Sequence, residues 1–238
     1  LKNDYDLFIS GSDQVWSPRC VGFDPAYFLT FADDKQKYSY AASFAVPTLP
    51  DEFIDEYKKR LNGFQKFSVR EPSGEKLVKE LTGRTAETHL DPTLLISADE
   101  WKKIAVSKID KPYILIFTAN PAVSLVDFAI KLSKEKNLPV YCINDAPHPV
   151  SHGINYIVAP TVEEFVGCFK NAEYVVTNSF HGTAFSVIFN KNLFVEFKNK
   201  SGRNIRSEGL LKSLGIDREI VDGNCRETEI NWYDVNEK

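Results

Sequence analysis

The sequence predicts an α/β fold of two lobes, each built on a parallel sheet. Short apolar runs alternate with amphipathic helical patterns along all 238 residues. The apolar runs are continuous, which is typical of strands covered on both faces. The polar stretch Lys108–Pro112 is the best candidate for a linker. We therefore expect one lobe over residues 1–107 and a second over residues 108–238, the latter including a C-terminal tail.

Eight apolar runs are the predicted strands. They lie at Tyr5–Ser10, Tyr38–Phe44, Phe67–Arg70, Tyr113–Thr118, Val140–Asn144, Asn155–Ala159, Tyr174–Thr177 and Leu193–Phe197. Alternation of strands with helices favours parallel pairing, because a crossover helix must return the chain to the same edge of the sheet. Both lobes are therefore expected to be Rossmann-like, and the N-terminal lobe to be incomplete at its opening strands.

Helical patterns fill the intervals between these runs. They span Asp51–Phe64, Trp101–Val106, Ala122–Lys136, Val162–Asn171, Ala184–Phe189 and Ile205–Leu214. Ser97 with Glu100, and Thr161 with Glu164, have the spacing of capping boxes at helix N-termini. Gly215 is the expected stop signal after the last helix, because glycine accepts the left-handed conformation there.

Composition excludes several classes of protein. The net charge of −4 provides no basic field for nucleic acid. No run approaches the ~18 apolar residues of a membrane span, so we expect no integral membrane segment and leave only peripheral association open. The four cysteines lie far apart without a CxxC pair, which favours a reducing cytosol over a disulfide scaffold or zinc site. We expect a cytoplasmic protein.

Polar side chains follow the first predicted strand in the run Ser10–Trp16, which reads SGSDQVW. Gly11 permits a tight turn, after which Ser12, Asp13 and Gln14 project polar groups at the end of the strand. Asp13 could accept a proton from a sugar hydroxyl, and Gln14 and Ser12 could bind that sugar. The alternative is an ordinary turn with an aspartate cap.

Arg70 stands at the end of another predicted strand, in the run SVRE. An arginine there can clamp a carboxylate or phosphate through two parallel hydrogen bonds. The alternative is an arginine paired with Glu71 or another carboxylate, which the local sequence favours. Asp91 precedes Pro92 in HLDP, where an Asx-type turn is more typical than a catalyst.

The run Thr177–Thr183, TNSFHGT, is the strongest local signal, because it lies between a strand and an apolar helix. Backbone N–H groups and the helix dipole at such a position favour an anion. His181 could protonate a leaving group or an alkene carbon. Asn178 and Ser179 are candidate ligands of the anion. The alternative is that one of them caps the helix while His181 only packs.

A basic run follows the next strand, with four cations in the nine residues KNKSGRNIR. Such a run is usually a solvated loop, but Lys198, Arg203 and Arg206 could line the same cleft as His181 and bind an anionic donor. His148 and His152 are spaced for a metal only in a helix, and the prolines around them oppose one. We therefore expect no metal.

Six runs, taken in order, resemble the polysaccharide pyruvyl transferase family. They are DLFISGSDQVW, SYAASF, FSVREPSG, HLDPTLLI, AEYVVTNSFHGTAFSVIFNKNLFV and IRSEGLLKSLGIDR, and they extend from Asp6 to Arg218. Singly, GSDQVW and TNSFHGTAF are fairly specific, and the ordered series is more so. Members of the family usually open with a further Rossmann-type segment, which has no counterpart in this sequence.

The resemblance implies a fold similar to two-domain GT-B glycosyltransferases, with the active site between the lobes. It implies phosphoenolpyruvate as donor, a lipid-linked or polymeric glycan as acceptor, and a pyruvate ketal as product. Arg70 and His181 match the motif residues implicated in donor binding and catalysis. Arg206 is the better match for a later cation, with Lys198 and Arg203 as alternatives. Phosphoenolpyruvate would be a co-substrate, and no cofactor is expected.

Two other functions fit parts of the pattern. A nucleotide-sugar-dependent GT-B glycosyltransferase would share two lobes, a helix N-terminus for phosphate and basic residues. A non-catalytic glycan-binding domain could keep the fold without the chemistry. The leaving product separates the two enzymes, since pyruvyl transfer releases inorganic phosphate and glycosyl transfer a nucleoside diphosphate.

Overall fold

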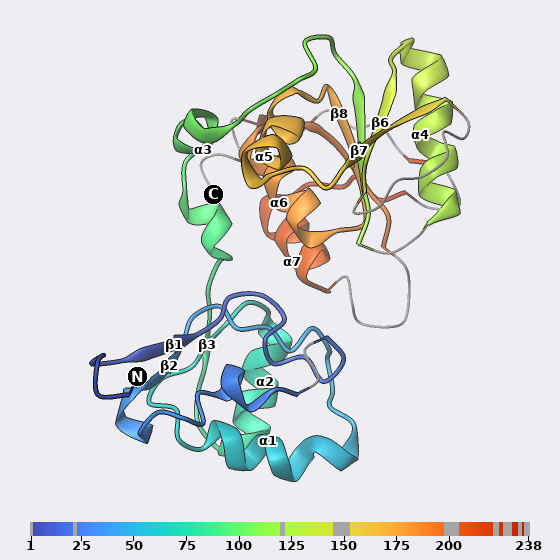
Figure 1. Cartoon of the computed structure of the whole chain (residues 1–238). Helices are drawn as coiled ribbons and strands as arrows, with labels where there is room; N and C mark the ends of the chain where they lie inside the picture. Colours follow the sequence, from blue (N-terminus) through green and yellow to red (C-terminus); the bar gives the residue numbers. More distant parts are fainter. Residues whose placement is uncertain are drawn as a thin grey trace. The chain divides into compact units, whose positions relative to one another are not determined.

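The computed structural model describes residues 2–20, 23–119, 122–144, 153–197, 205–220, 224–225, 230–232 and 235. Contacts divide the chain into two compact units (Figure 1). Unit 1 comprises Leu1–Leu95 with Lys200–Arg206, and unit 2 comprises Ile96–Asn199 with Ser207–Lys238. The predicted linker Lys108–Pro112 thus lies in unit 2.

The stretch that precedes this linker packs within unit 2. Helix α3 (Ala98–Ile104) carries Trp101, whose ring meets the edge of Phe185 at 5.1 Å between centroids. After the helix, the Val106 N–H donates to the carbonyl of Glu163 at 2.9 Å. The aromatic contact of Trp101 and the backbone hydrogen bond of Val106 both hold this stretch against unit 2.

The described residues of unit 1 form four short strands in parallel pairs. Strand β1 (Phe8–Ser10) pairs with β2 (Lys37–Ser39), and β3 (Ser68–Val69) pairs with β4 (Glu87–Thr88). Isolated parallel bridges, Tyr38 to Lys66 and Ala42 to Val69, connect the β2 and β3 segments. Strand β4 has no counterpart among the predicted strands, because its two residues are polar and exposed and leave no apolar run.

Helices and turns of unit 1 cross between these strands. They are the 3₁₀ turns η1 (Pro25–Phe28), η2 (Asp34–Gln36), η3 (Asp51–Phe53) and η4 (Pro92–Leu95), with α1 (Ile54–Leu61) and α2 (Pro72–Thr82). Sequence patterns predicted α1 and missed α2. No helix was predicted over these residues, although Pro72 at the first helical position is preorganised for one. Gly74 lets that helix approach the Val69 side chain closely.

An aromatic cluster fills the core of unit 1. Trp16 is fully buried, and its ring lies 5.3 Å from the rings of both Phe44 and Phe64. The Tyr57 hydroxyl, also buried, donates to the Trp16 carbonyl at 2.6 Å. Trp16 closes the GSDQVW run, so the core holds the end of that run in place.

Unit 2 is built on a five-stranded parallel sheet with the order β7-β6-β5-β8-β9. The strands are β5 (Ile114–Phe117), β6 (Val140–Asn144), β7 (Ile154–Val158), β8 (Tyr174–Thr177) and β9 (Asn192–Val195). Phe117, the last residue of β5, lies opposite Ile143 on one side and Thr177 on the other. All of these strands overlap predicted strands, and β6 and β8 match them to the residue.

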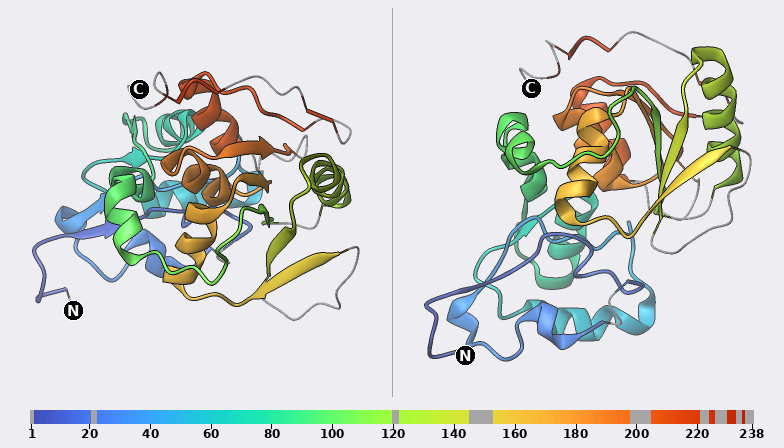
Figure 2. Two further views of the ribbon diagram at one scale, coloured as in Figure 1. Left: turned by 90° about the horizontal axis from the view of Figure 1, so that it is seen from above. Right: turned by 45° about the horizontal axis from the view of Figure 1, so that its top comes forward.

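Helices cover both faces of this sheet (Figures 1 and 2). Helix α4 (Val123–Lys136) packs Phe128 with Ile114 and Ile116 on one face. Helices α5 (Val162–Asn171) and α6 (Phe180–Ile188) pack Phe169 and Phe185 with Leu115 on the other. Helix α7 (Ile205–Leu214) places Leu211 in the same second layer. Alternate β5 residues thus enter opposite layers.

The predicted helix signals can be checked at two of these helices. Thr161 and Glu164 form the reciprocal capping box expected before α5. Gly215 follows α7 with φ of +71°, the left-handed conformation expected of a stop signal. The predicted α/β class with parallel sheets is confirmed. Within the described residues, no helix combines the length and apolar character that a membrane crossing requires.

We expect Trp16→Ala to destabilise unit 1 by roughly 3–5 kcal/mol, because it removes a large buried ring and leaves a cavity. The free energy of unfolding from urea titration would measure the change. Leu95→Ala is the control, since Leu95 belongs to unit 1 and is exposed, and its cost should stay within about 0.5 kcal/mol. An equal loss in the free energy of unfolding for the two variants would show that Trp16 does not stabilise the core of unit 1.

Candidate functional site

Three strands of unit 1 end in polar residues. β1 is followed by Gly11–Gln14, β3 by Arg70, and β4 by the segment containing Asp91. Because parallel strands bring their carboxyl ends to one edge, these residues are placed to meet. Gly11 is required at its position, since its φ is +120° and a Cβ would meet the Tyr40 carbonyl oxygen.

The Arg70 guanidinium lies between two carboxylates. Its Nη1 is 2.5 Å from Asp91 Oδ2, and its Nη2 is 2.8 Å from Asp13 Oδ1. The Arg70 side chain is 2% exposed, so both ion pairs are at least partly shielded from water. Pairing with a carboxylate is the alternative that the sequence favoured, although the partners are Asp13 and Asp91 and not Glu71. A direct role for Arg70 in binding the donor stays a prediction.

Asp91 does more than the Asx-type turn that HLDP indicates. Its Oδ1 accepts hydrogen bonds from the Thr93 N–H at 3.0 Å and the Thr93 hydroxyl at 2.8 Å, which is the expected turn. Its Oδ2 accepts from Arg70 and from the Ser12 hydroxyl, the latter at 3.1 Å. The carboxylate therefore ties the segments after β1, β3 and β4 together.

Burial alone would raise the pKa of Asp91. The hydrogen bonds from Thr93 and the positive charge of Arg70 outweigh burial, and together they hold the pKa below the ordinary value of 3.8. Asp91 is thus an anion at neutral pH. A buried carboxylate is stable in this form only because each oxygen has donors.

Arg206 brings a second guanidinium to Asp13. Its Nη1 lies 3.5 Å from Asp13 Oδ1, the same oxygen that Arg70 contacts. Burial, and then repulsion by Arg70, lower the pKa of Arg206 to about 10, against the attraction of Glu71 and Asp13. Arg206 therefore stays protonated at neutral pH. Asp13 is 57% exposed, so its carboxylate meets both cations and solvent.

The two candidate acceptor ligands lie on either side of Asp13 in the chain. The Ser12 hydroxyl also lies 2.9 Å from the carbonyl oxygen of Ala41, after β2, and its one proton is shared between that oxygen and Asp91 Oδ2. Gln14 accepts from the thiol of Cys20 at 3.1 Å. Both side chains are half-buried. Their contact with an acceptor sugar stays a prediction.

Glu71 is a buried carboxylate that sequence reasoning considered only as a partner of Arg70. Its Oε1 accepts from the Ser43 hydroxyl and from the N–H groups of Phe44 and Ala45, at 3.0–3.1 Å. Glu71 therefore secures the loop after β2, and its charge acts on Arg206. The only sequence signal was its position directly after Arg70.

In unit 2, the run Thr177–Thr183 leads from the end of β8 through Asn178 and Ser179 into α6, which begins at Phe180 and therefore four residues earlier than the predicted Ala184. Ser179 is the N-cap, and its hydroxyl accepts from the Gly182 N–H at 3.5 Å. Asn178 accepts from the Ala119 N–H at 2.9 Å. Gly182 must be glycine, because a Cβ would meet the Thr177 side chain. Asn178 and Ser179 are both buried, and these contacts form the frame of the turn.

His181 is the second residue of α6 and is half-buried, with its ring against the edge of Phe180 at 5.4 Å between centroids. Glu196, just after β9, is a residue that the sequence analysis missed. It is buried, accepts from the Ser124 hydroxyl, and its N–H donates to the Thr177 carbonyl at 3.0 Å. An acidic residue thus adjoins the strand that leads to His181.

Four of the residues considered in the sequence lie outside the described part of the chain: Lys198, Arg203, His148 and His152. Their roles stay predictions. Among the described residues, no group of three or more His, Cys, Asp or Glu side chains is placed to hold a metal ion.

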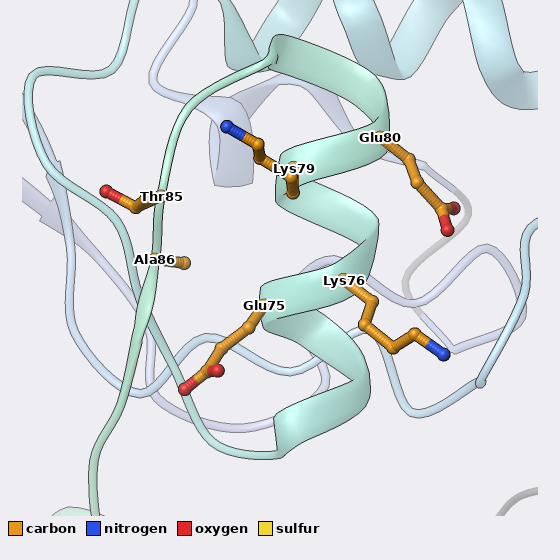
Figure 3. Close-up of a pocket in the computed structure, with 6 residues that line it drawn as sticks. All are labelled: Glu75, Lys76, Lys79, Glu80, Thr85 and Ala86. Atoms are coloured by element: carbon orange, nitrogen blue, oxygen red, sulfur yellow. The ribbon is translucent and has the colours of Figure 1, made fainter.

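One surface hollow of unit 1 is lined by residues outside this cluster of charges. It has a volume of about 410 Å³ and is formed by α2 and the segment after it, with Glu75 and Lys79 extending toward Thr85 and Ala86 (Figure 3). Glu75 accepts from Thr88 at 2.6 Å and Lys79 donates to the Gly83 carbonyl at 2.8 Å. Glu75 and Lys79 are thus used locally, and none of the candidate site residues lines this hollow.

Comparison with protein families gives a match to the model described as polysaccharide pyruvyl transferase, over residues 1–195. None of the curated proteins matches the chain. This family model covers the unit 1 charge cluster except Arg206, and in unit 2 it includes the whole TNSFHGT turn.

Solved structures with a similar fold include the UDP-GlcNAc 2-epimerase of Methanocaldococcus jannaschii, in complex with UDP-GlcNAc and UDP. The likeness has a TM-score of 0.53 at 11% identity and covers 99% of this chain and 75% of the epimerase. A second is the iron-containing dodecameric glycosyltransferase TibC of enterotoxigenic E. coli, with a TM-score of 0.36, 15% identity, and coverage of 68% and 41%. The epimerase supports the GT-B-like fold and nothing further.

We expect the free energy of unfolding of unit 1 to fall on acidification partly through Asp91. Its folded pKa is lowered, so its contribution is fully present above the unfolded value of 3.8 and is lost as the pH falls through the folded value. Urea titrations at a series of pH values should show a shallower acidic decline in Asp91→Asn. Asp55→Asn, which alters an exposed ion pair, is the control and should keep the wild-type slope. An unchanged slope in Asp91→Asn would contradict the assignment.

Proposed function

Because the chain belongs to the polysaccharide pyruvyl transferase family, we propose that it transfers a pyruvyl group from phosphoenolpyruvate to two hydroxyls of a glycan unit. The product would be a cyclic pyruvate ketal and the leaving group inorganic phosphate. The observation that carries this proposal is the family match over residues 1–195, which includes both Arg70 and His181. The acceptor would be a polymeric or lipid-linked sugar reached from the cytoplasm, as in exopolysaccharide or cell-envelope synthesis.

The charge cluster of unit 1 suits a reaction between an anionic donor and a neutral hydroxyl. Arg70 and Arg206 both approach one oxygen of Asp13. We propose Asp13 as the base that accepts the hydroxyl proton, with Ser12 and Gln14 beside it on the acceptor side. The guanidinium groups would bind the donor phosphate or carboxylate, and Lys198 and Arg203 would add to that charge. Electrostatic preorganisation of this kind is usually the largest contribution to catalysis.

The α6 turn of unit 2 suits proton delivery. His181 sits in the first turn of a nine-residue helix, where N–H groups and the dipole favour an anion. We propose that His181 protonates the methylene carbon of phosphoenolpyruvate, while Ser179 and Asn178 shape the site of the anionic donor. General acid catalysis of this kind contributes typically ~10²–10⁴-fold in rate.

The proposed reaction steps balance in protons and in bonds formed and broken. Protonation of the methylene carbon makes a methyl group and leaves an oxocarbenium-like centre at the neighbouring carbon. The first hydroxyl attacks this centre and gives its proton to Asp13. The C–O bond to phosphate then breaks and the second hydroxyl closes the ketal. Of the two hydroxyl protons, one is balanced by the new methyl proton and the other leaves with phosphate. These reaction steps need no cofactor beyond phosphoenolpyruvate as co-substrate, and no metal.

A nucleotide-sugar-dependent transferase is the second candidate. The GT-B-like fold is compatible with both candidates and does not choose between them. The discriminating experiment incubates the protein with a glycan acceptor and either phosphoenolpyruvate, UDP-sugars or GDP-sugars, and measures inorganic phosphate and nucleoside diphosphate. Phosphate release that needs both phosphoenolpyruvate and the acceptor supports pyruvyl transfer. Release of nucleoside diphosphate alone would replace it with glycosyl transfer.

We expect His181→Ala to reduce phosphoenolpyruvate turnover by ~10²-fold or more while the protein stays folded, because the side chain is half-buried and adds little stability. Phosphate release and circular dichroism would measure the two effects. His89→Ala is the matched control, since His89 is also partly exposed but lies in unit 1 and carries no proposed role. Wild-type turnover in His181→Ala would remove this residue from the mechanism.

We expect Arg70→Lys to raise the donor KM at least about tenfold. A lysine presents a point charge and cannot hold two groups in the planar fork that Arg70 uses for Asp13 and Asp91. Steady-state phosphate release against phosphoenolpyruvate concentration is the measurement. Arg60→Lys, which alters an ion pair with Glu56 elsewhere in unit 1, should leave that KM unchanged. An unaltered KM in Arg70→Lys would make Arg70 structural.

A further inference from the structure

Asp91 is the point at which the segments after three strands of unit 1 are joined. The carboxylate is 3% exposed and divides its partners between its two oxygens. Oδ1 accepts only from Thr93 among the bonds described above, which closes the local turn. Oδ2 accepts from Ser12 after β1 and from Arg70 after β3. The turn therefore uses Oδ1, whereas Oδ2 connects Asp91 with the cluster around Asp13.

Two guanidinium groups approach Asp13, and Glu71 and Asp91 supply further negative charge to this cluster. Asp13 Oδ1 faces Arg70 Nη2 at 2.8 Å and Arg206 Nη1 at 3.5 Å. Cys20 and Glu71 act on the same group of charges through Arg206. Two cations at one carboxylate stabilise its ionised form and weaken it as a base. Asp91 contacts the other side of the Arg70 guanidinium at 2.5 Å and offsets that charge.

We propose that Asp91 is a positioning residue for the transfer reaction. It fixes the Arg70 guanidinium at the end of β3 and neutralises part of its charge, so that Asp13 keeps the proton affinity that a base requires. This inference rests on the proposed function and on Asp13 as its base. Asp91 acts through Arg70 and Ser12 and touches neither the donor nor the acceptor.

The geometry separates this role from support of the turn. A residue needed only for the turn would act through Oδ1, and Thr93→Val removes the hydroxyl partner of that oxygen while sparing Oδ2. Asp91→Asn keeps the shape of the side chain and an oxygen for the turn, but removes the charge opposite Arg70. Both variants therefore perturb the turn around Asp91. Only Asp91→Asn also changes the electrostatic field at Asp13.

The experiment measures phosphate release from phosphoenolpyruvate in the full chain across pH for wild type, Asp91→Asn and Thr93→Val. In Asp91→Asn the acidic limb of kcat/KM should move to lower pH by roughly one unit, because Arg70 then stabilises ionised Asp13 with no carboxylate of Asp91 on its other side. The plateau of kcat should fall roughly three- to tenfold, because the base is weaker. Thr93→Val should keep both the limb and the plateau, with a lower thermal midpoint as its only change.

Two outcomes would overturn the inference. One is an acidic limb and plateau in Asp91→Asn that match wild type, and the other is the same kinetic change in Thr93→Val as in Asp91→Asn. Should Asp91→Asn fail to fold, Asp91→Ser gives the same reading, since it removes the charge and keeps a hydroxyl for Thr93. Wild-type protein without phosphate release would instead reject the proposed function. Normal wild-type turnover with unaffected Asp91 variants would reject this inference alone.

Discussion

The described strands pair in parallel with their neighbours, and this pairing decides where polar side chains can gather. A parallel sheet brings the carboxyl ends of its strands to one edge, so segments far apart in the sequence meet there. In unit 1, residues 12, 13, 70 and 91 come together in this way. In unit 2, β8 delivers the TNSFHGT turn to the corresponding edge of a five-stranded sheet.

Burying charge imposes the second constraint on unit 1. A guanidinium that is 2% exposed must have counter-charges, and Arg70 receives them from two different strand ends. Glu71 meets the same requirement by collecting three donors from the loop after β2. The resulting network holds its members in fixed positions. An anionic ligand would therefore compete with Asp13 and Asp91 for the positive charge of Arg70 and Arg206.

The two parts of the candidate site were unequally predictable. The α6 turn follows from local sequence, because a strand, a capping serine and an apolar helix are adjacent in the chain, and Ser179 caps the helix in the structure. The partners of Arg70 are 57 residues before it and 21 after it, and no local pattern connects them. For Asp91 the sequence HLDP indicates only a turn, because the contact with Thr93 is local and the contact with Arg70 is not. Glu196 gave no signal, being one acidic residue after an apolar strand.

By itself, the sequence determined the α/β class, most strands, the major helices of unit 2, and the family, because these depend on periodicity, capping residues and short motifs that are local in the chain. It missed α2 and β4, where a proline start and two exposed polar residues hide the element. Only the tertiary structure decided that Arg70 is buried between Asp13 and Asp91 and that Arg206 approaches the same Asp13 oxygen. The physical reason is that pairing of buried charges depends on which strand ends the fold brings together, and that is a property of the whole sheet.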